Sequence, residues 1–157
     1  MRISIVVCLL SVAALAACGG GQKTTYTTAN GTATVTRNGS TTTYESKEGK
    51  VTVGAVDPTK LGAPLYPGAA QTEENSSISV TSSKGSGTMA SFKTADKFPA
   101  VEAWYKAHLP NGSEKMNVNE GGGSIAEFMM AENTPNQTLV MITGKDGQTQ
   151  IVITHGK

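Results

Sequence analysis

Few side chains in this sequence are of a type and spacing that support catalysis or metal binding. Histidine, the usual general base near neutral pH, occurs only as His108 and His155. We expect His108 to be half exposed at a helix edge, and His155 to fray in the C-terminal tail. No G-x-S-x-G, H-x-x-x-H or C-x-x-C pattern occurs that would indicate a serine nucleophile or a bound metal. The sequence therefore predicts no catalytic residues, no metal site and no cofactor, and favours a protein that is not an enzyme.

Cys18 is the residue with the clearest chemical setting, in the stretch LAACGGG. Arg2 supplies a positive start, and residues 3–14 supply an apolar core shorter than the about 20 residues that span a bilayer. Small residues then mark a processing site, so residues 1–17 are predicted to be a secretory signal peptide. The alternative is that Cys18 is an ordinary small apolar residue beside a standard cleavage site.

The residues Leu15-Ala16-Ala17-Cys18 resemble the lipobox of bacterial lipoproteins. The resemblance implies that the Cys18 thiol is acylated with fatty acids such as palmitate, that the chain is cut before it, and that the new amine is acylated too. Two or three acyl chains make such an attachment durable, whereas one binds only marginally. In Gram-negative lipoproteins, an aspartate directly after the acylated cysteine resembles an inner-membrane retention signal. This chain has Gly19 at that position, which favours the periplasmic face of the outer membrane. We therefore expect a cell-envelope protein whose first partner is the membrane.

The charge balance of the chain excludes an electrostatic case for nucleic acid. The formal net charge is +1, and loss of Arg2 with the leader leaves the mature chain balanced. A balanced chain carries no basic surface of the kind that binds phosphate backbones, so no nucleic-acid partner is predicted. Only Cys18 remains in the mature chain, so we also expect no disulfide.

The segment that follows the lipidated tether at residues 18–23 is rich in threonine. Residues 24–56 consist of short alternating runs separated by turn signals, of which Asn38-Gly39 is typical of a tight hairpin. This pattern predicts a small β-meander. Its apolar content is thin, so it either docks on the following domain or stays a mobile stalk. A plain solvated linker is the alternative.

Prolines dominate the next segment, residues 57–72, which is predicted to cross between the two parts of the chain without a helix or a central strand. Pro67-Gly68 fits the central positions of a type II turn. Tyr66, just before it, is expected to close an edge of the core. The functional alternative makes Tyr66 an exposed ring that contacts a partner.

Residues 73–157 contain the only convincing helix, at 96–109. Asp96 suits its N-cap, and a stripe of apolar residues at helical spacing predicts one buried face. The stripe comprises Phe98, Val101, Tyr105 and Leu109. Trp104 lies beside that stripe, at the boundary of the core, and is the second candidate for a partner contact.

The strands predicted around this helix give the order β-β-α-β-β-β-β, which favours a two-layer α+β domain with an antiparallel sheet, preceded by the Thr-rich meander. Residues 139–142 and 151–153 are apolar on both strand faces, and one helix covers only one face. We expect the second face to be covered by the Thr-rich meander or by a partner. Residues 60–155 resemble a group of uncharacterised small bacterial lipoproteins with a Tyr-Pro-Gly-Ala turn and an aromatic pair like Trp104-Tyr105. That resemblance implies a fold and no activity.

These observations favour a membrane-anchored envelope lipoprotein that acts as a non-catalytic binding or assembly module and holds an envelope protein. An inhibitor-type or structural lipoprotein is the first alternative. A small periplasmic enzyme is less favoured, because Trp104, His108 and nearby carboxylates would have to converge in a cleft.

Overall fold

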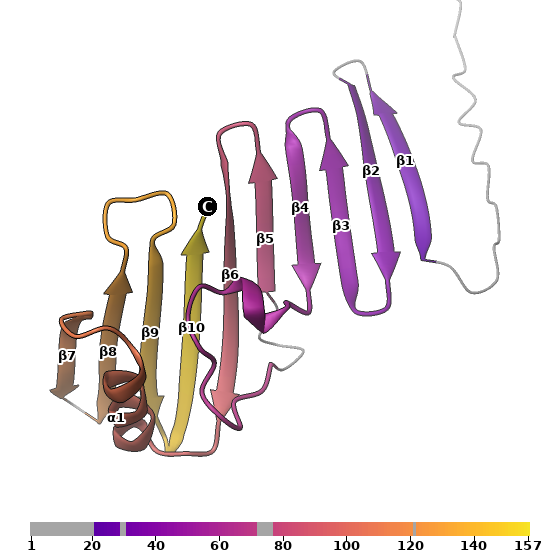
Figure 1. Cartoon of the computed structure of the whole chain (residues 1–157). Coiled ribbons are helices and arrows are strands. Elements are labelled where there is room, and N and C mark those ends of the chain that lie inside the picture. The colour runs from indigo at the N-terminus through magenta and orange to yellow at the C-terminus, as the bar shows by residue number, and fades with distance from the viewer. Residues whose placement is uncertain (1–20, 29–30, 72–76, 121) are drawn as a thin grey trace, which may run out of the picture.

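A computed structural model describes residues 21–28, 31–71, 77–120 and 122–157. The leader at 1–17 and the predicted lipid attachment at Cys18 lie outside the described residues. The described chain forms one antiparallel sheet of ten strands with one α-helix (Figure 1). The strands are β1 (Gln22–Thr28), β2 (Gly31–Asn38), β3 (Thr41–Ser46), β4 (Gly49–Gly54), β5 (Ser77–Ser82), β6 (Gly85–Thr94), β7 (Glu114–Glu120), β8 (Gly123–Met130), β9 (Thr138–Lys145) and β10 (Gln148–Gly156). The helix α1 spans Phe98–His108, and a short 3-10 turn, η1, spans Pro58–Lys60. An antiparallel sheet with one helix confirms the α+β class.

Local turn chemistry explains several of the hairpins. Asp146 and Gly147 both have positive φ, 52° and 78°, and they join β9 to β10 with Lys145 opposite Gln148. Aspartate and glycine tolerate this left-handed conformation, so the predicted hairpin turn is confirmed. At the turn between β2 and β3, Gly39 likewise adopts the left-handed conformation, with φ of 56°.

The Thr-rich strands extend the sheet and do not cover it. β4 pairs with β5 in an antiparallel register that places Val53 opposite Ile78, so β1 to β4 continue the same sheet outward from β5. The strand order is β1-β2-β3-β4-β5-β6-β10-β9-β8-β7. The expectation that the Thr-rich segment covers the second face of the later strands is therefore wrong. Edge pairing satisfies its backbone hydrogen bonds, which a docked layer would have to satisfy separately.

Helix α1 and the crossing segment lie on one face of the sheet (Figure 1). We call this the covered face and its opposite the open face. The core fills the space between the covered face and these two elements, and Leu61 of the crossing segment is fully buried in it. From the sheet, the buried apolar side chains are Ala90, Phe92, Ala126, Phe128, Val140, Ile142, Ile151 and Ile153. Among the described residues, the second layer thus buries apolar side chains of β6, β10, β9 and β8.

The helix presents the predicted stripe to the core, with Phe98, Val101 and Tyr105 buried and Leu109 buried just beyond its end. Its beginning differs from the prediction. Lys97, not Asp96, is the N-cap residue, and it makes no side-chain cap. The Asp96 carboxylate instead accepts a hydrogen bond from the Tyr66 hydroxyl at 2.7 Å. The Asp96 carboxylate therefore binds Tyr66, which is distant in the sequence, and does not cap the helix.

Candidate functional site

Strand register shows which side chains share the open face. Residues directly opposite each other on neighbouring strands point to the same side of a sheet. Val53 lies opposite Ile78, and Ile78 lies opposite Met89, so these three side chains form one row on the open face. The row continues through Thr154 of β10 to Leu139 of β9. Apolar contacts between strands therefore run across the boundary between the Thr-rich strands and the later ones.

Every large apolar side chain that the described residues leave exposed belongs to the open face. The eight are Tyr26 (57%), Tyr44 (47%), Ile78 (38%), Val80 (43%), Met89 (45%), Met116 (39%), Val118 (41%) and Ile125 (38%). They come from strands at both edges of the sheet and at its centre. A random scatter would divide them between the two faces, so this distribution marks one continuous apolar surface.

The register also assigns the half-buried apolar residues between them. Val35 lies opposite Tyr44, and Val51 lies opposite both Tyr44 and Val80. On the later strands, Met141 lies opposite Val152 on the same face. These residues fill the gaps between the exposed ones, and among the described residues no helix or second layer lies over them.

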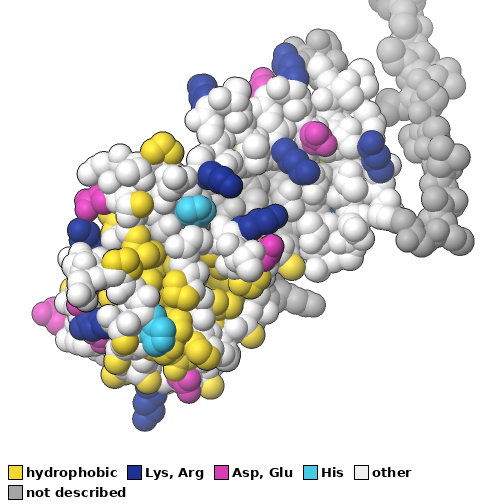
Figure 2. Space-filling view, viewed as in Figure 1, with side chains coloured by type: hydrophobic (Ala, Val, Ile, Leu, Met, Phe, Trp, Pro, Cys, Tyr) yellow, Lys and Arg dark blue, Asp and Glu magenta, His cyan; other side chains and the backbone are white. Residues whose placement is uncertain are grey.

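Over the Thr-rich strands, the other side of the sheet has the opposite character. One row of directly paired residues there is almost entirely hydroxylic: Lys23, Thr36, Thr43, Thr52, Ser79 and Thr88. The hydroxyls of Thr43 and Thr52 lie 3.3 Å apart, and those of Ser79 and Thr88 lie 3.1 Å apart. Figure 2 views this side, and hydrophobic side chains gather over α1 and the crossing segment but are scarce over β1 to β4. The Thr-rich strands are thus amphipathic, polar on one side and apolar on the open face.

Charged residues on the open face lie toward its ends and leave the centre neutral. Arg37 belongs to the row of Thr42 and Val53 on β2, the second strand from one edge. Glu127 lies opposite Met116 and Met141 on β8, the second strand from the other edge. The remaining charges on this face, Lys93, Glu120 and Lys145, stand at or near strand ends.

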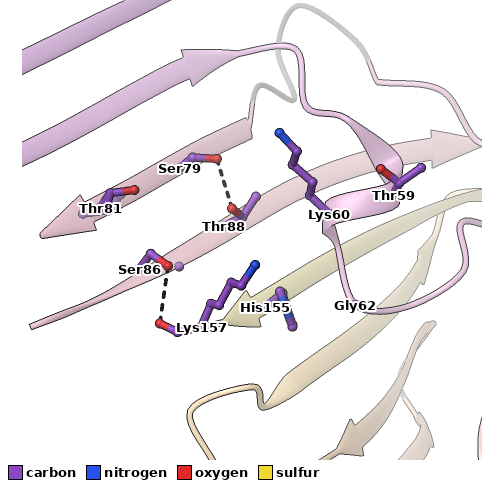
Figure 3. Close-up of a pocket in the computed structure, with 11 residues that line it drawn as sticks. Thr59, Lys60, Gly62, Ser79, Thr81, Ser86, Thr88, His155 and Lys157 are labelled. Atoms are coloured by element: carbon purple, nitrogen blue, oxygen red, sulfur yellow. Dashed lines mark hydrogen bonds between the residues drawn. The ribbon is translucent and has the colours of Figure 1, made fainter.

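A hollow of about 450 Å³ lies on the opposite side, where η1 stands over β5, β6 and β10 (Figure 3). Lys60 reaches it from η1 and Lys157 from the end of β10, while four hydroxyls form its floor. Those hydroxyls belong to Ser79, Thr81, Ser86 and Thr88. No Asp, Glu or Cys side chain lines this hollow, so its hydroxyls, its two lysines and His155 have no carboxylate partner there of the kind that orients the base of a catalytic triad.

His155 lies at the wall of this hollow and is held firmly. It belongs to β10, and its Nδ1 lies 2.8 Å from the Thr138 hydroxyl. The expectation that His155 frays is therefore wrong, because pairing of β10 with both β6 and β9 fixes the last strand of the sheet. His108, by contrast, is exposed, as its helix-edge position indicated, and its ring stacks on Trp104 with centroids 4.1 Å apart.

The two residues proposed from the sequence as partner contacts meet each other on the covered side. The ring of Tyr66 packs edge to face on Trp104, with centroids 5.4 Å apart, and both side chains are half buried. The hydrogen bond to Asp96 raises the pKa of the Tyr66 hydroxyl, and burial raises that of Tyr105 beneath Trp104. Their contacts tie the crossing segment to α1, which is the structural reading that the sequence offered for Tyr66.

Among the described residues, no group of three or more His, Cys, Asp and Glu side chains is placed to hold a metal ion. Within the same part of the chain, no helix is long and apolar enough to cross a membrane. Sequence reasoning missed the open face, although its signal was present in the alternation of Val51 with Val53 and of Ile78 with Val80. That alternation predicted the strands of the meander and of the next hairpin, but not that their apolar sides form one surface. No protein-family model matches the chain, and neither the curated proteins nor the solved structures contain a match.

Proposed function

We propose that this protein is a lipid-anchored, non-catalytic binding module of the cell envelope and that the open face is its working surface. One observation supports this most directly: the eight large apolar side chains that are exposed among the described residues all lie on that face. Contiguous apolar patches larger than a few hundred Å² mark interaction sites on soluble proteins. The polar hollow on the opposite side is lined by hydroxyls, lysines and His155 but by no carboxylate.

The energetics favour occupation of the open face. Burial of apolar surface contributes about 25 cal/mol per Å², and fully burying one large side chain contributes about 1.5–3 kcal/mol. The exposed side chains form rows with half-buried neighbours, so a flat partner would cover several of them at once. Because the centre of the face carries no charge, covering it would leave no buried charge unpaired.

The proposed anchor places this surface close to the membrane. β1 begins at Gln22, a few residues after Cys18 in the sequence. At no more than about 3.6 Å per residue, this spacer keeps the edge of the sheet within about 15 Å of the acylated sulfur. We further propose that residues 73–157 form the two-layer unit with the order β-β-α-β-β-β-β, and that residues 24–56 are its Thr-rich extension. The location on the periplasmic face of the outer membrane belongs to the same proposal.

Protection of single cysteines in the native envelope tests the function. Val80 and Thr81 are neighbours in β5, both exposed, with Val80 on the open face and Thr81 on the other side. Mature, anchored Val80→Cys should react slowly with a membrane-permeant maleimide in intact envelopes, whereas Thr81→Cys should react fast. Both should react fully after denaturation, which gives the reference for each site. Equal and fast reaction at both positions would show that nothing covers the open face and would overturn the proposal.

A further inference from the structure

We infer that the occupant of the open face is a second copy of this chain, stacked face to face about a two-fold axis that exchanges the two ends of the sheet. This inference rests on the proposed function, because it names the partner for the same surface. Four features support it: the width of the face, its shape, the distribution of its side chains and the placement of its charges.

The width of the face suits another sheet and not a helix. Ten strands spaced about 4.8 Å apart are about 48 Å wide, whereas a helix with its side chains is only about 10–12 Å in diameter. With strands about six residues long, the face measures roughly 950 Å². A stable interface buries about 800 Å² on each partner, so one copy has enough surface to hold another.

The shape of the sheet permits self-stacking. Sheets twist with a fixed hand, and a two-fold rotation does not change that hand. Two copies related by such a rotation therefore twist in the same sense and can stack face to face. Aligned sheets in β-sandwiches pack about 10 Å apart with strands within about 30° of each other. The arrangement proposed here is a sandwich of two identical sheets whose strands cross at a wider angle. The register places Tyr26 four residues to one side of the row of Ile78 and Met89, and Met116 two residues to the other side, so the ends of the sheet overlap only when the axis is tilted away from the strand direction.

An exchange of ends places complementary side chains together. β5 and β6 are the two central strands of the ten, so the axis passes between them. Ile78 of one copy then lies near Met89 of the other, and the same contact is repeated by symmetry. The Thr-rich end, with Tyr26 and Tyr44, comes to lie over the end that carries Met116 and Met141. Tyrosine rings against methionine sulfur make a favourable contact, and the flexible methionines adapt to the flat Thr-rich strands.

The charges decide between the two ways of stacking the sheet on itself. Arg37 and Glu127 occupy strands that are second from opposite edges. An exchange of ends therefore brings Arg37 of each copy to the strand that carries Glu127 of the other. In a stack without this exchange, β2 would lie over β2 of the other copy and β8 over β8. Arg37 would then approach Arg37 and Glu127 would approach Glu127, and such like-charge contacts are unfavourable. Within one sheet the two residues are seven strand spacings apart, about 34 Å, so they cannot form this pair inside one molecule.

Charge reversal in the anchored protein tests the inference. In the Val80→Cys background, Arg37→Glu alone and Glu127→Arg alone should each raise the rate of maleimide labelling about two- to thirtyfold, since the two-fold axis makes each substitution disrupt two charge pairs. The double reversal should return labelling to the level of Val80→Cys alone. The matched control is Glu45→Arg, because Glu45 lies opposite Thr34 and Lys50 on the other side of the sheet. It should leave the labelling unchanged.

A crosslinking experiment provides the second measurement. Arg37→Cys and Glu127→Cys chains, co-expressed and anchored, should give a dimer with a short bismaleimide. Thr36→Cys, on the same strand but the other face, should not do so with Glu127→Cys. Absence of the dimer and of rescue by double reversal, with Val80→Cys still protected, would overturn the second copy while leaving the proposed function intact. Fast labelling of Val80→Cys would remove both.

Discussion

The Tyr66 hydroxyl donates a hydrogen bond to the Asp96 carboxylate at 2.7 Å, and this contact joins the crossing segment to the residue just before the cap of α1. Tyr66 also packs edge to face on Trp104, so one side chain contacts both the helix and the residues that lead into it. This relationship explains how a proline-rich segment without regular strands holds a defined course over the covered face. It also makes Tyr66 a reporter of whether that segment is seated.

The first prediction concerns the titration of Tyr66. Its hydrogen bond to Asp96 raises the pKa above the ordinary 10.0, with burial as the next cause. The pKa is higher in the folded protein, so the stabilisation is fully present below pH 10 and is lost as the pH rises through the folded pKa. Asp96→Asn should lower the pKa of Tyr66. Titration of the tyrosine ring carbons by NMR measures it, and an unchanged value in Asp96→Asn would contradict the assignment.

The second prediction concerns Tyr105, whose hydroxyl is buried beside the backbone of Tyr66. Among the described residues, this hydroxyl has no partner in hydrogen-bonding geometry. Removing an unpaired buried hydroxyl while keeping the ring should leave the free energy of unfolding unchanged or raise it by up to about 1 kcal/mol. Urea denaturation of Tyr105→Phe measures this. Tyr66→Phe is the matched control and should lower stability, because it removes the bond to Asp96. A loss of more than about 1 kcal/mol in Tyr105→Phe would mean that the hydroxyl is paired.

Sequence reasoning succeeded where short-range pattern decides the structure. The buried stripe of α1 follows from helical spacing, and the turn at Asp146-Gly147 follows from residues that accept positive φ. It failed where a distant segment competes. Asp96 fits the local pattern of a cap, but Tyr66, far away in the sequence, takes its carboxylate.

The open face could not be derived from the sequence for a related reason. Alternation around Val51 and Ile78 shows that two faces of a strand differ, but it does not show what lies against either face. The pairing of β4 with β5 spans the whole crossing segment, and no local signal specifies such a long-range contact. Only that register reveals that apolar residues from both parts of the chain form one surface.

The third prediction tests the closeness of the crossing segment to β9 and β10. Gly62 has φ of 70°, and a Cβ there would press on Nδ1 of His155 and lie 2.5 Å from the Thr138 hydroxyl. Gly62→Ala therefore adds a clash to the strain of a left-handed conformation. Gly68 has φ of 80° with open space around it, so Gly68→Ala carries the strain alone, about 1–2 kcal/mol. Thermal or urea unfolding should show a clearly larger loss for Gly62→Ala. Equal losses would mean that the segment lies farther from β9 and β10 than described.

The fourth prediction concerns the anchor. Cys18→Ala should release the protein from the membrane fraction and abolish incorporation of a clickable fatty acid, because the acylated sulfur would be the only strong membrane attachment. Cys8→Ala is the matched control, since it changes the other cysteine of the sequence but leaves the lipobox intact. Membrane-bound, labelled Cys18→Ala protein would refute the lipidation proposal, and mass spectrometry of the natural protein would then identify its true start.

The fifth prediction separates the core from the Thr-rich strands. The buried apolar side chains of the described chain all come from Leu61 or later, whereas β1 to β4 contribute only exposed and half-buried ones. A variant that begins at Gly54 keeps the carbonyl that accepts hydrogen bonds from Gln71 and Ser77. It should therefore still unfold in one cooperative transition, with a smaller dependence on urea because less surface is exposed. A gradual melt without a sigmoidal step would show that β1 to β4 are integral to the core. In this variant β5 becomes an unpaired edge strand that carries Ile78 and Val80. The variant should therefore aggregate at a lower protein concentration than the mature protein does.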